Sequence, residues 1–300
     1  MKYILPFIVL WLSPTSQSQT LKGTVLDSLS KKPLSYANFV IKGKNIGAYS
    51  DELGNYSISI IKVSRKDTLV VSLIGYHPQK ISLADFIGSK NLNYNFELSP
   101  KTEQLEEVFI LNKAKTYYNH SIKLTTGNRN QVFPATIPFG YETATLIENP
   151  KQKKGKLIEL HIKFKDSSRE LYETHQTYYR LAFYTINDLG FPGQLLYYES
   201  IIIKPEIDKK NYKFDLEDKA IPFTEKGIFV SLETVKPDNV KLKSSMYLTT
   251  PSLLHTHTKK ALKYTRFGSN DWSLKSRKSV FKKRLFAVPF LKLNIVYEKD

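Results

Sequence analysis

Two histidines near the C-terminal end of this chain have the type and spacing of metal ligands. His255 and His257 alternate along an extended segment, so their imidazoles lie on one side and could hold a metal ion. No acidic residue lies close to them in the sequence, and zinc sites use three or four protein ligands. We therefore expect no metal site and no cofactor here.

A second group near the C-terminus combines aromatic rings with hydrogen-bonding side chains. Its members are Tyr264, Arg266, Asn270 and Trp272. Sugars stack on aromatic faces while Arg and Asn side chains hydrogen-bond hydroxyl groups, so we predict these four as ligand-binding residues for a glycan. Basic tracts at 275–278 and 282–284 follow them. The alternative is that Trp272 packs in the core and the tracts face solvent, because large aromatic residues are usually buried.

Motifs for enzymatic chemistry are absent from the sequence. There is no cysteine and no Gly-x-Ser-x-Gly turn to present a catalytic serine. No glycine-rich phosphate loop occurs, and no spacing among the acidic residues selects the carboxylate pair of a glycosidase. We expect a non-enzymatic protein without catalytic residues, and a hydrolase is the alternative.

Alternating apolar residues predict that β-strands position these side chains. The sequence has 19 Tyr and 17 Phe but only 2 Met, a composition that favours sheet. In one clear case the residues expected to face the core are Ile158, Leu160, Ile162 and Phe164. About eight such strands across residues 141–300 predict a jelly-roll-like β-sandwich. Residues 113–140 are expected to hold a joint and the first strands.

Residues 19–112 alternate in the same way, with shorter strands and denser turns. Roughly six or seven strands in this stretch predict a small β-sandwich. Between two of them, residues 47–56 contain an Asp51-Glu52-Leu53-Gly54 step that is typical of a tight turn. Asp hydrogen-bonds the backbone two residues on, and Gly takes the left-handed conformation. We interpret residues 47–56 as architecture rather than as a binding loop.

Five motifs run in order through this first third. They are Gly23-x-Val25-x-Asp27, Pro33-Leu34-x-x-Ala37-Asn38-Phe39-x-Ile41-Lys42-Gly43, Gly47-x-x-Ser50-Asp51-x-x-Gly54-x-Tyr56, Ser72-x-Ile74-Gly75-Tyr76 and Leu105-Glu106-Glu107-Val108. Together they make residues 20–112 resemble the carboxypeptidase-regulatory-like domain. The resemblance implies a transthyretin-like β-sandwich, of a kind found at the N-termini of outer-membrane receptors and in exported envelope proteins. It implies no catalytic residue, because the motif residues shape turns and core.

The N-terminus predicts export. A lysine, an apolar stretch from Ile4 to Leu12 and small residues up to Ser18 are typical of a secretory signal peptide over residues 1–18. The apolar stretch is shorter than the roughly 20 residues that span a bilayer, so we expect no transmembrane span. We expect a periplasmic, outer-membrane-associated or secreted protein without disulfides, since cysteine is absent.

The net charge of +17 is concentrated in the second part of the chain. Residues 19–112 carry 11 Lys and Arg against 9 Asp and Glu, a net charge of +2. A basic surface suits anionic glycans, lipid headgroups or an acidic protein, although it also serves solubility alone. Without a recognition helix or stacking platform we expect no nucleic-acid partner.

These patterns predict an all-β, exported, non-enzymatic binding or scaffold protein of the bacterial cell envelope. The first domain would serve as a spacer or docking module, and the partner would be a glycan or an envelope protein. A protein that assembles through an exposed sheet edge is a further alternative.

Overall fold

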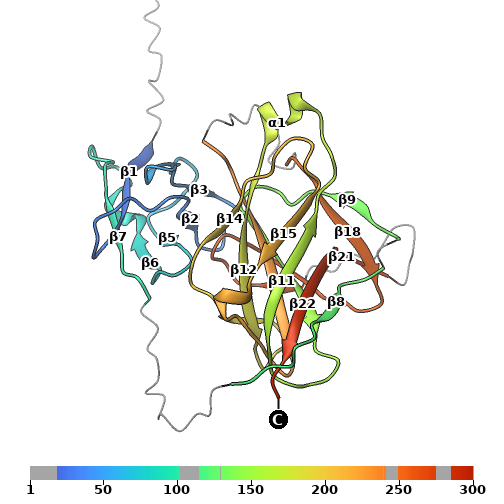
Figure 1. The fold of residues 1–300 in the computed structure, drawn as a ribbon. Helices are drawn as coiled ribbons and strands as arrows, with labels where there is room; N and C mark the ends of the chain where they lie inside the picture. The colour runs from blue at the N-terminus through green and yellow to red at the C-terminus, as the bar shows by residue number, and fades with distance from the viewer. Residues whose placement is uncertain are drawn as a thin grey trace, which may run out of the picture.

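The computed structural model describes residues 19–101, 115–128, 130–238, 240, 249–274 and 285–299. The signal peptide expected at 1–18, the motif at 105–108 and the basic tracts at 275–278 and 282–284 lie outside these residues. The described chain forms two β-sandwich bodies, a smaller and a larger one, with one short α-helix, α1 (Arg169–His175) (Figure 1). The expected all-β fold is confirmed.

The first sandwich comprises residues 20–101 and has two sheets. One has the order β4-β1-β7, from β4 (Asn55–Ser59), β1 (Thr20–Asp27) and β7 (Phe96–Leu98). The other has the order β3-β2-β5-β6, from β3 (Gly47–Tyr49), β2 (Asn38–Ile41), β5 (Thr68–Ser72) and β6 (Gln79–Ser82). A 3₁₀ turn, η1 (Leu83–Asp85), follows β6. In the core between the sheets, Phe39 stacks on Tyr56 at 4.2 Å between ring centroids, and Phe96 meets both edge-on.

The tight turn expected at 51–54 is present. Asp51 Oδ1 accepts hydrogen bonds from the backbone N–H groups of Leu53 and Asn55, at 2.9 and 2.7 Å. Gly54 has φ +78°, and a Cβ there would lie 2.8 Å from the carbonyl oxygen of Val25. Only glycine suits both the backbone conformation and the close approach of β1.

The second sandwich comprises residues 115–299, and its largest sheet has seven strands. Its main path has the order β13-β12-β17-β10-β19-β20, with β14 paired to β12. The bounds are β10 (Tyr141–Glu148), β12 (Tyr178–Ile186), β13 (Pro192–Leu195), β14 (Ile201–Ile203), β17 (Gly227–Val235), β19 (Lys263–Phe267) and β20 (Ser273–Leu274). We call this sheet the large sheet.

Two further sheets complete the second sandwich. The sheet opposite the large sheet has the order β15-β11-β22-β8, with β16 paired to β11. Its strands are β8 (Ile122–Thr125), β11 (Gly155–Lys163), β15 (Asn211–Asp215), β16 (Pro222–Phe223) and β22 (Leu291–Tyr297), and η2 (Glu217–Lys219) precedes β16. A three-stranded sheet has the order β21-β18-β9, from β21 (Phe286–Pro289), β18 (Leu253–Thr258) and β9 (Phe133–Ala135). The predicted joint at 113–140 thus contains β8 and β9.

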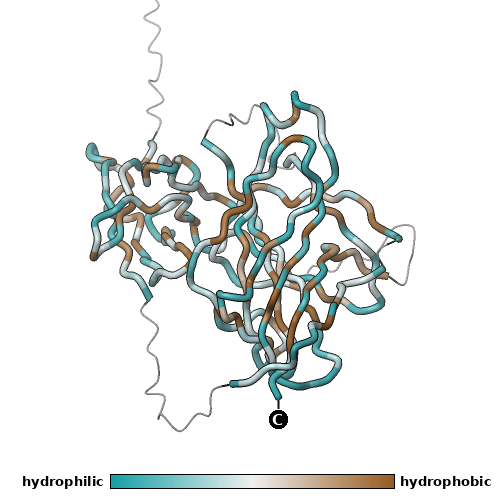
Figure 2. Tube along the Cα trace, in the orientation of Figure 1, coloured by the Kyte–Doolittle hydropathy of each residue, from teal (hydrophilic) through white to brown (hydrophobic). Residues whose placement is uncertain are grey.

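The core of the second sandwich lies between the large sheet and the β11 sheet. Tyr179, Leu181 and Phe183 of β12 reach the same cluster as Leu160 and Ile162 of β11. The expectation for Ile158 is wrong, because the strand register shifts between Leu157 and Glu159. This bulge puts Leu157 into the core and leaves Ile158 half-buried. Figure 2 shows the apolar stretches gathered along these inner strands.

The other face of the large sheet carries the side chains that alternate with the core residues. On β12 these include Arg180 and Tyr184, and on β17 they include Glu233. The first sandwich lies beside β12 and β14 (Figure 1), and its Ile74 packs against the small apolar cluster on this outer face. No helix among the described residues is long and apolar enough to cross a membrane.

Candidate functional site

A buried carboxylate joins the two sandwiches. Glu233 Oε1 accepts hydrogen bonds from Asn38 Nδ2 at 2.8 Å and from the Tyr49 hydroxyl at 2.9 Å, both in the first sandwich. Its Oε2 pairs with Arg180 Nη1 at 2.8 Å. The same guanidinium donates from Nη2 to the carbonyl oxygen of Tyr36. One ion pair of the second sandwich therefore binds three residues of the first.

A second carboxylate with a similar arrangement lies beside it. Glu142 Oε1 accepts hydrogen bonds from the hydroxyls of Tyr184 at 2.8 Å and Ser231 at 2.7 Å. Its Oε2 accepts one from Arg266 Nε at 2.6 Å. Burial lowers the pKa of Arg266, but the charge of Glu142 and the neighbouring Tyr184 outweigh this effect, so the net pKa is raised. Burial and the Glu142 charge raise the pKa of Tyr184, which therefore stays a protonated donor.

Strand pairing places these four charges in a single row. Arg180 is opposite Glu233 in the β12–β17 ladder, Glu233 is opposite Glu142 in β17–β10, and Glu142 is opposite Arg266 in β10–β19. We call these four residues the charged row. Two adjacent carboxylates would repel each other, and an arginine on each outer side offsets that repulsion. The sequence signal was a charged residue inside an apolar strand, but it did not indicate which strands pair.

Exposed contacts surround this buried junction. Glu52 Oε1 accepts hydrogen bonds from Lys204 Nζ at 2.8 Å and from the Tyr36 hydroxyl at 2.7 Å. The backbone N–H of Glu52 donates to Asp238 Oδ2 at 2.9 Å. The hydrogen bond from Lys204 lowers the pKa of the Glu52 carboxyl. Residues 47–56, which sequence reasoning treated as architecture alone, thus also supply junction contacts through Tyr49 and Glu52.

Glycines allow the two backbones to approach closely. A Cβ on Gly75 would lie 2.3 Å from the carbonyl oxygen of Tyr198 in the second sandwich. A Cβ on Gly268 would lie 2.1 Å from Val40 Cγ2 in the first. A side chain at Gly75 would therefore require the two backbones to move apart, whereas one at Gly268 would require the side chains of Val40 and Asn38 to shift.

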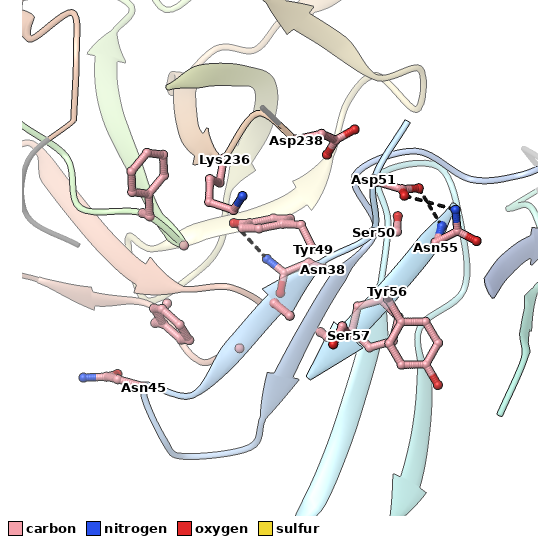
Figure 3. Close-up of a pocket in the computed structure, with 16 residues that line it drawn as sticks. Asn38, Asn45, Tyr49, Ser50, Asp51, Asn55, Tyr56, Ser57, Lys236 and Asp238 are labelled. Carbon is pink, nitrogen blue, oxygen red and sulfur yellow. Dashed lines mark hydrogen bonds between the residues drawn. The ribbon is translucent and has the colours of Figure 1, made fainter. Parts of the chain in front are cut away.

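One of the hollows at the junction lies against β3. This β3 pocket has a volume of about 590 Å³, and its lining includes Tyr49, Tyr56, Lys236, Asp238 and Phe267. Figure 3 shows Asn38 hydrogen-bonded to Tyr49, with Lys236 beside Tyr49 and Asp238 on the same loop of the second sandwich as Lys236. Burial lowers the pKa of Lys236, partly opposed by Asp238. Its ammonium donates to the carbonyl oxygens of Pro237 and Val240, so its hydrogen bonds remain within its own loop.

A second hollow, which we call the arginine cleft, is about 540 Å³ in volume and contains the whole charged row in its lining. Loops of both sandwiches form its walls, including residues 72–76 of the first and 193–195 of the second. Asn38 lines both hollows. Residues of the junction network thus contribute to the lining of both cavities.

The four residues predicted to bind a ligand take different positions. Arg266 lines the arginine cleft, and its guanidinium lies 4.2 Å from the Trp272 ring. Trp272 is half-buried and meets Tyr184 edge-on at 5.7 Å. Tyr264 is half-buried against Phe229 and Phe191. The structure thus brings Arg266 and Trp272 together and places Tyr264 nearby on the same strand as Arg266.

Asn270 contacts the first sandwich. Its Oδ1 accepts a hydrogen bond from the backbone N–H of Gly43 at 3.1 Å, and its Nδ2 donates to the carbonyl oxygen of Lys44 at 3.3 Å. These bonds occupy the amide at the junction. Its predicted part in ligand binding stays a prediction, as do those of the other three residues.

The two histidines of the 255–257 pair lie in β18. His255 is buried beside the carbonyl oxygen of Leu253, and burial lowers its pKa to about 3. His257 stacks on Phe133 with ring centroids 4.7 Å apart. Across the part of the chain that the structure describes, no three His, Asp or Glu side chains form a group that could hold a metal ion.

Comparisons with known proteins assign the first sandwich. Residues 21–110 match the CarboxypepD_reg-like domain. The resemblance read from the motifs is confirmed. A stretch of 136 residues, 45% of this chain, is 33% identical to the TonB-dependent receptor SusC of Bacteroides thetaiotaomicron and covers 12% of that receptor.

Solved structures resemble the whole chain only weakly. A carbohydrate-binding candidate from Bacteroides uniformis aligns over 93% of this chain and 98% of its own, with 11% identity and a TM-score of 0.22. A structure of infectious bursal disease virus, Gx strain, aligns over 93% of this chain and 65% of its own, with 9% identity and a TM-score of 0.23. Similarities at this level define neither the fold family nor the ligand of the second sandwich.

Proposed function

We propose that this chain is a non-enzymatic binding or scaffold protein of the bacterial cell envelope. In this proposal the carboxypeptidase-regulatory-like domain docks on the second sandwich and holds it in one orientation. The sequence similarity to a TonB-dependent receptor and the signal-peptide pattern at 1–18 support an envelope location.

The observation that carries the docking is the buried pair Arg180–Glu233. Arg180 is 2% exposed and Glu233 is 6% exposed, and both hydrogen-bond the first sandwich. A buried charge that loses a partner is strongly destabilising, so separating the sandwiches would leave these groups to be rehydrated or unpaired. Such an interface favours one fixed arrangement over two freely moving domains.

The charged row also favours binding over catalysis. A general acid or base must bring an oxygen or nitrogen within hydrogen-bond reach of the substrate proton. All four carboxylate oxygens of Glu142 and Glu233 already accept hydrogen bonds from within the protein. Carboxylates bonded in this way suit the role of structural anchors.

The experiment compares envelope complexes of the full chain with those of two matched glycine variants. Gly75→Ala introduces a clash with Tyr198 across the junction. Gly88→Ala is the control, because Gly88 also has a positive φ, +89°, but no atom lies within 4 Å of a Cβ at that position. We expect the wild type and Gly88→Ala to retain a glycan or protein partner in native pull-downs from an envelope fraction. Gly75→Ala should lose this partner, because its two sandwiches no longer dock in one orientation. A partnerless monomer that turns over peptide or glycan substrates would refute the proposal in favour of a hydrolase.

A glycan-binding accessory protein is the second candidate, favoured by one observation. Trp272 and Tyr264 both lie half-buried beside the apolar cluster on the outer face of the large sheet, so neither residue is fully enclosed. This candidate predicts retention on polysaccharide that falls when either residue becomes Ala. Unchanged retention in both variants would exclude it.

A further inference from the structure

The arginine cleft offers hydrogen-bond donors but no free carboxylate oxygen. Both glutamates of the charged row use each oxygen on protein donors, as described above. In contrast, Arg266 is 23% exposed and bonds through Nε and Nη2, which leaves Nη1 without a bond to any described residue. A ligand entering the cleft therefore meets N–H groups that need acceptors.

Two buried polar atoms that line the cleft also have no partner. Arg180 Nε and Ser269 Oγ are both buried and make no hydrogen bond with the described residues. Leaving a buried donor unpaired is unfavourable, so an acceptor that reached either atom would be favoured. Both atoms are buried from solvent, so a ligand reaches them only if the wall of the cleft moves.

The charges that line the cleft sum to one positive charge. Arg180 and Arg266 are balanced by the two glutamates of the row. Lys101 lies in the wall, and its ammonium forms no ion pair among the residues that the structure describes. A net positive cleft with spare donors complements an anionic ligand.

The remaining wall suits a ring-shaped carbon skeleton. It combines the rings of Tyr76 and Tyr198 with the aliphatic side chains of Leu73, Ile74 and Leu195. Aromatic faces pack well against the apolar faces of sugar rings. The volume of about 540 Å³ lies within the range of about 300–1,000 Å³ that small-ligand pockets occupy.

We propose that the arginine cleft binds a carboxylated saccharide of one or two rings. The carboxylate pairs with Arg266 Nη1 and Lys101, and a sugar ring lies against Tyr198 and Leu195. This inference rests on the docked arrangement of the proposed function, because each sandwich supplies one wall of the cleft.

The test is calorimetric titration of the full chain with three probes: digalacturonate, the neutral disaccharide galactobiose and inorganic phosphate. We expect digalacturonate to bind at least about tenfold more tightly than either of the other two. Lys101→Gln should weaken digalacturonate binding about tenfold, whereas Lys90→Gln, at an exposed lysine outside the cleft, should leave it unchanged.

Three results would overturn the inference: no binding of digalacturonate, equal binding of galactobiose or phosphate, or unchanged binding by Lys101→Gln. Small-angle scattering of the ligand-free samples measures the docking separately. A docked chain that fails to bind overturns the cleft assignment alone. A chain whose sandwiches are not docked overturns the proposed function as well.

Discussion

Replacing Arg180 by Met removes a buried cation while keeping most of the apolar stem of the side chain. The change leaves Glu233 Oε2 without its partner at 2.8 Å, in a side chain that is only 8% exposed. It also leaves the carbonyl oxygen of Tyr36 without its guanidinium donor. Removing one member of a buried ion pair costs about 3–5 kcal/mol, and we expect Arg180→Met to lower the free energy of unfolding by this amount.

The matched control is an ion pair of the same length at the rim of the junction. Lys204 and Glu52 are also 2.8 Å apart, but their side chains are 55% and 53% exposed. Solvent screens such a pair, so Lys204→Met should cost much less than Arg180→Met. Since the two distances are equal, the length of the ion pair does not account for the difference between the variants, which reflects burial together with the lost hydrogen bond to Tyr36.

A double variant separates the lone charge from the lost contact. Arg180→Met with Glu233→Met leaves no unpaired ion, so its cost should be smaller than the sum of the two single variants. Some cost remains, because Asn38 and Tyr49 lose their acceptor. Urea unfolding followed by circular dichroism gives all four free energies. The reasoning is refuted if Arg180→Met costs no more than Lys204→Met, or if the two single effects add.

Three further outcomes are expected. Gly75→Ala and Gly88→Ala impose similar strain at φ +84° and +89°, but only Gly75→Ala should enlarge the radius of gyration in small-angle scattering, because it alone clashes across the junction. Burial holds the folded-state pKa of His255 at about 3, below its unfolded value, so the unfolded chain takes up the proton first and stability falls as the pH drops below about 6.5. His255→Gln should lose about 2 kcal/mol less than the wild type between about pH 7.5 and pH 5 in urea titrations, and parallel losses would contradict this. Trp272→Ala removes a ring 4.2 Å from the Arg266 guanidinium and should lower the free energy of unfolding by about 1–3 kcal/mol. An unchanged midpoint of urea unfolding would contradict this expectation.

Local patterns in the sequence predicted the β class and the identity of the first sandwich. They predicted about eight strands over residues 141–300, whereas the described residues there form thirteen, from β10 to β22, several of them only two to four residues long. Alternation along a strand assigns side chains to two faces because successive residues point in opposite directions. The Asp51–Gly54 turn followed from side-chain bonding and positive φ, which act over a few residues. Ile158 was assigned to the wrong face, because a bulge interrupted the alternation that predicted it.

The charged row depended on tertiary structure alone. Glu142, Arg180, Glu233 and Arg266 lie on four strands, and nothing in the sequence connects these four charges, although Arg266 was predicted as a ligand-binding residue. A period of two says which face a residue occupies but not which strand pairs with it, since pairing depends on the packing of the whole sheet. Asn270 is similar: its type suggested sugar binding, and docking placed its amide on the backbone of Gly43. The sequence thus determined the β class and the first domain, while the pairing of distant strands and the docking of the two sandwiches decided where the cavities lie.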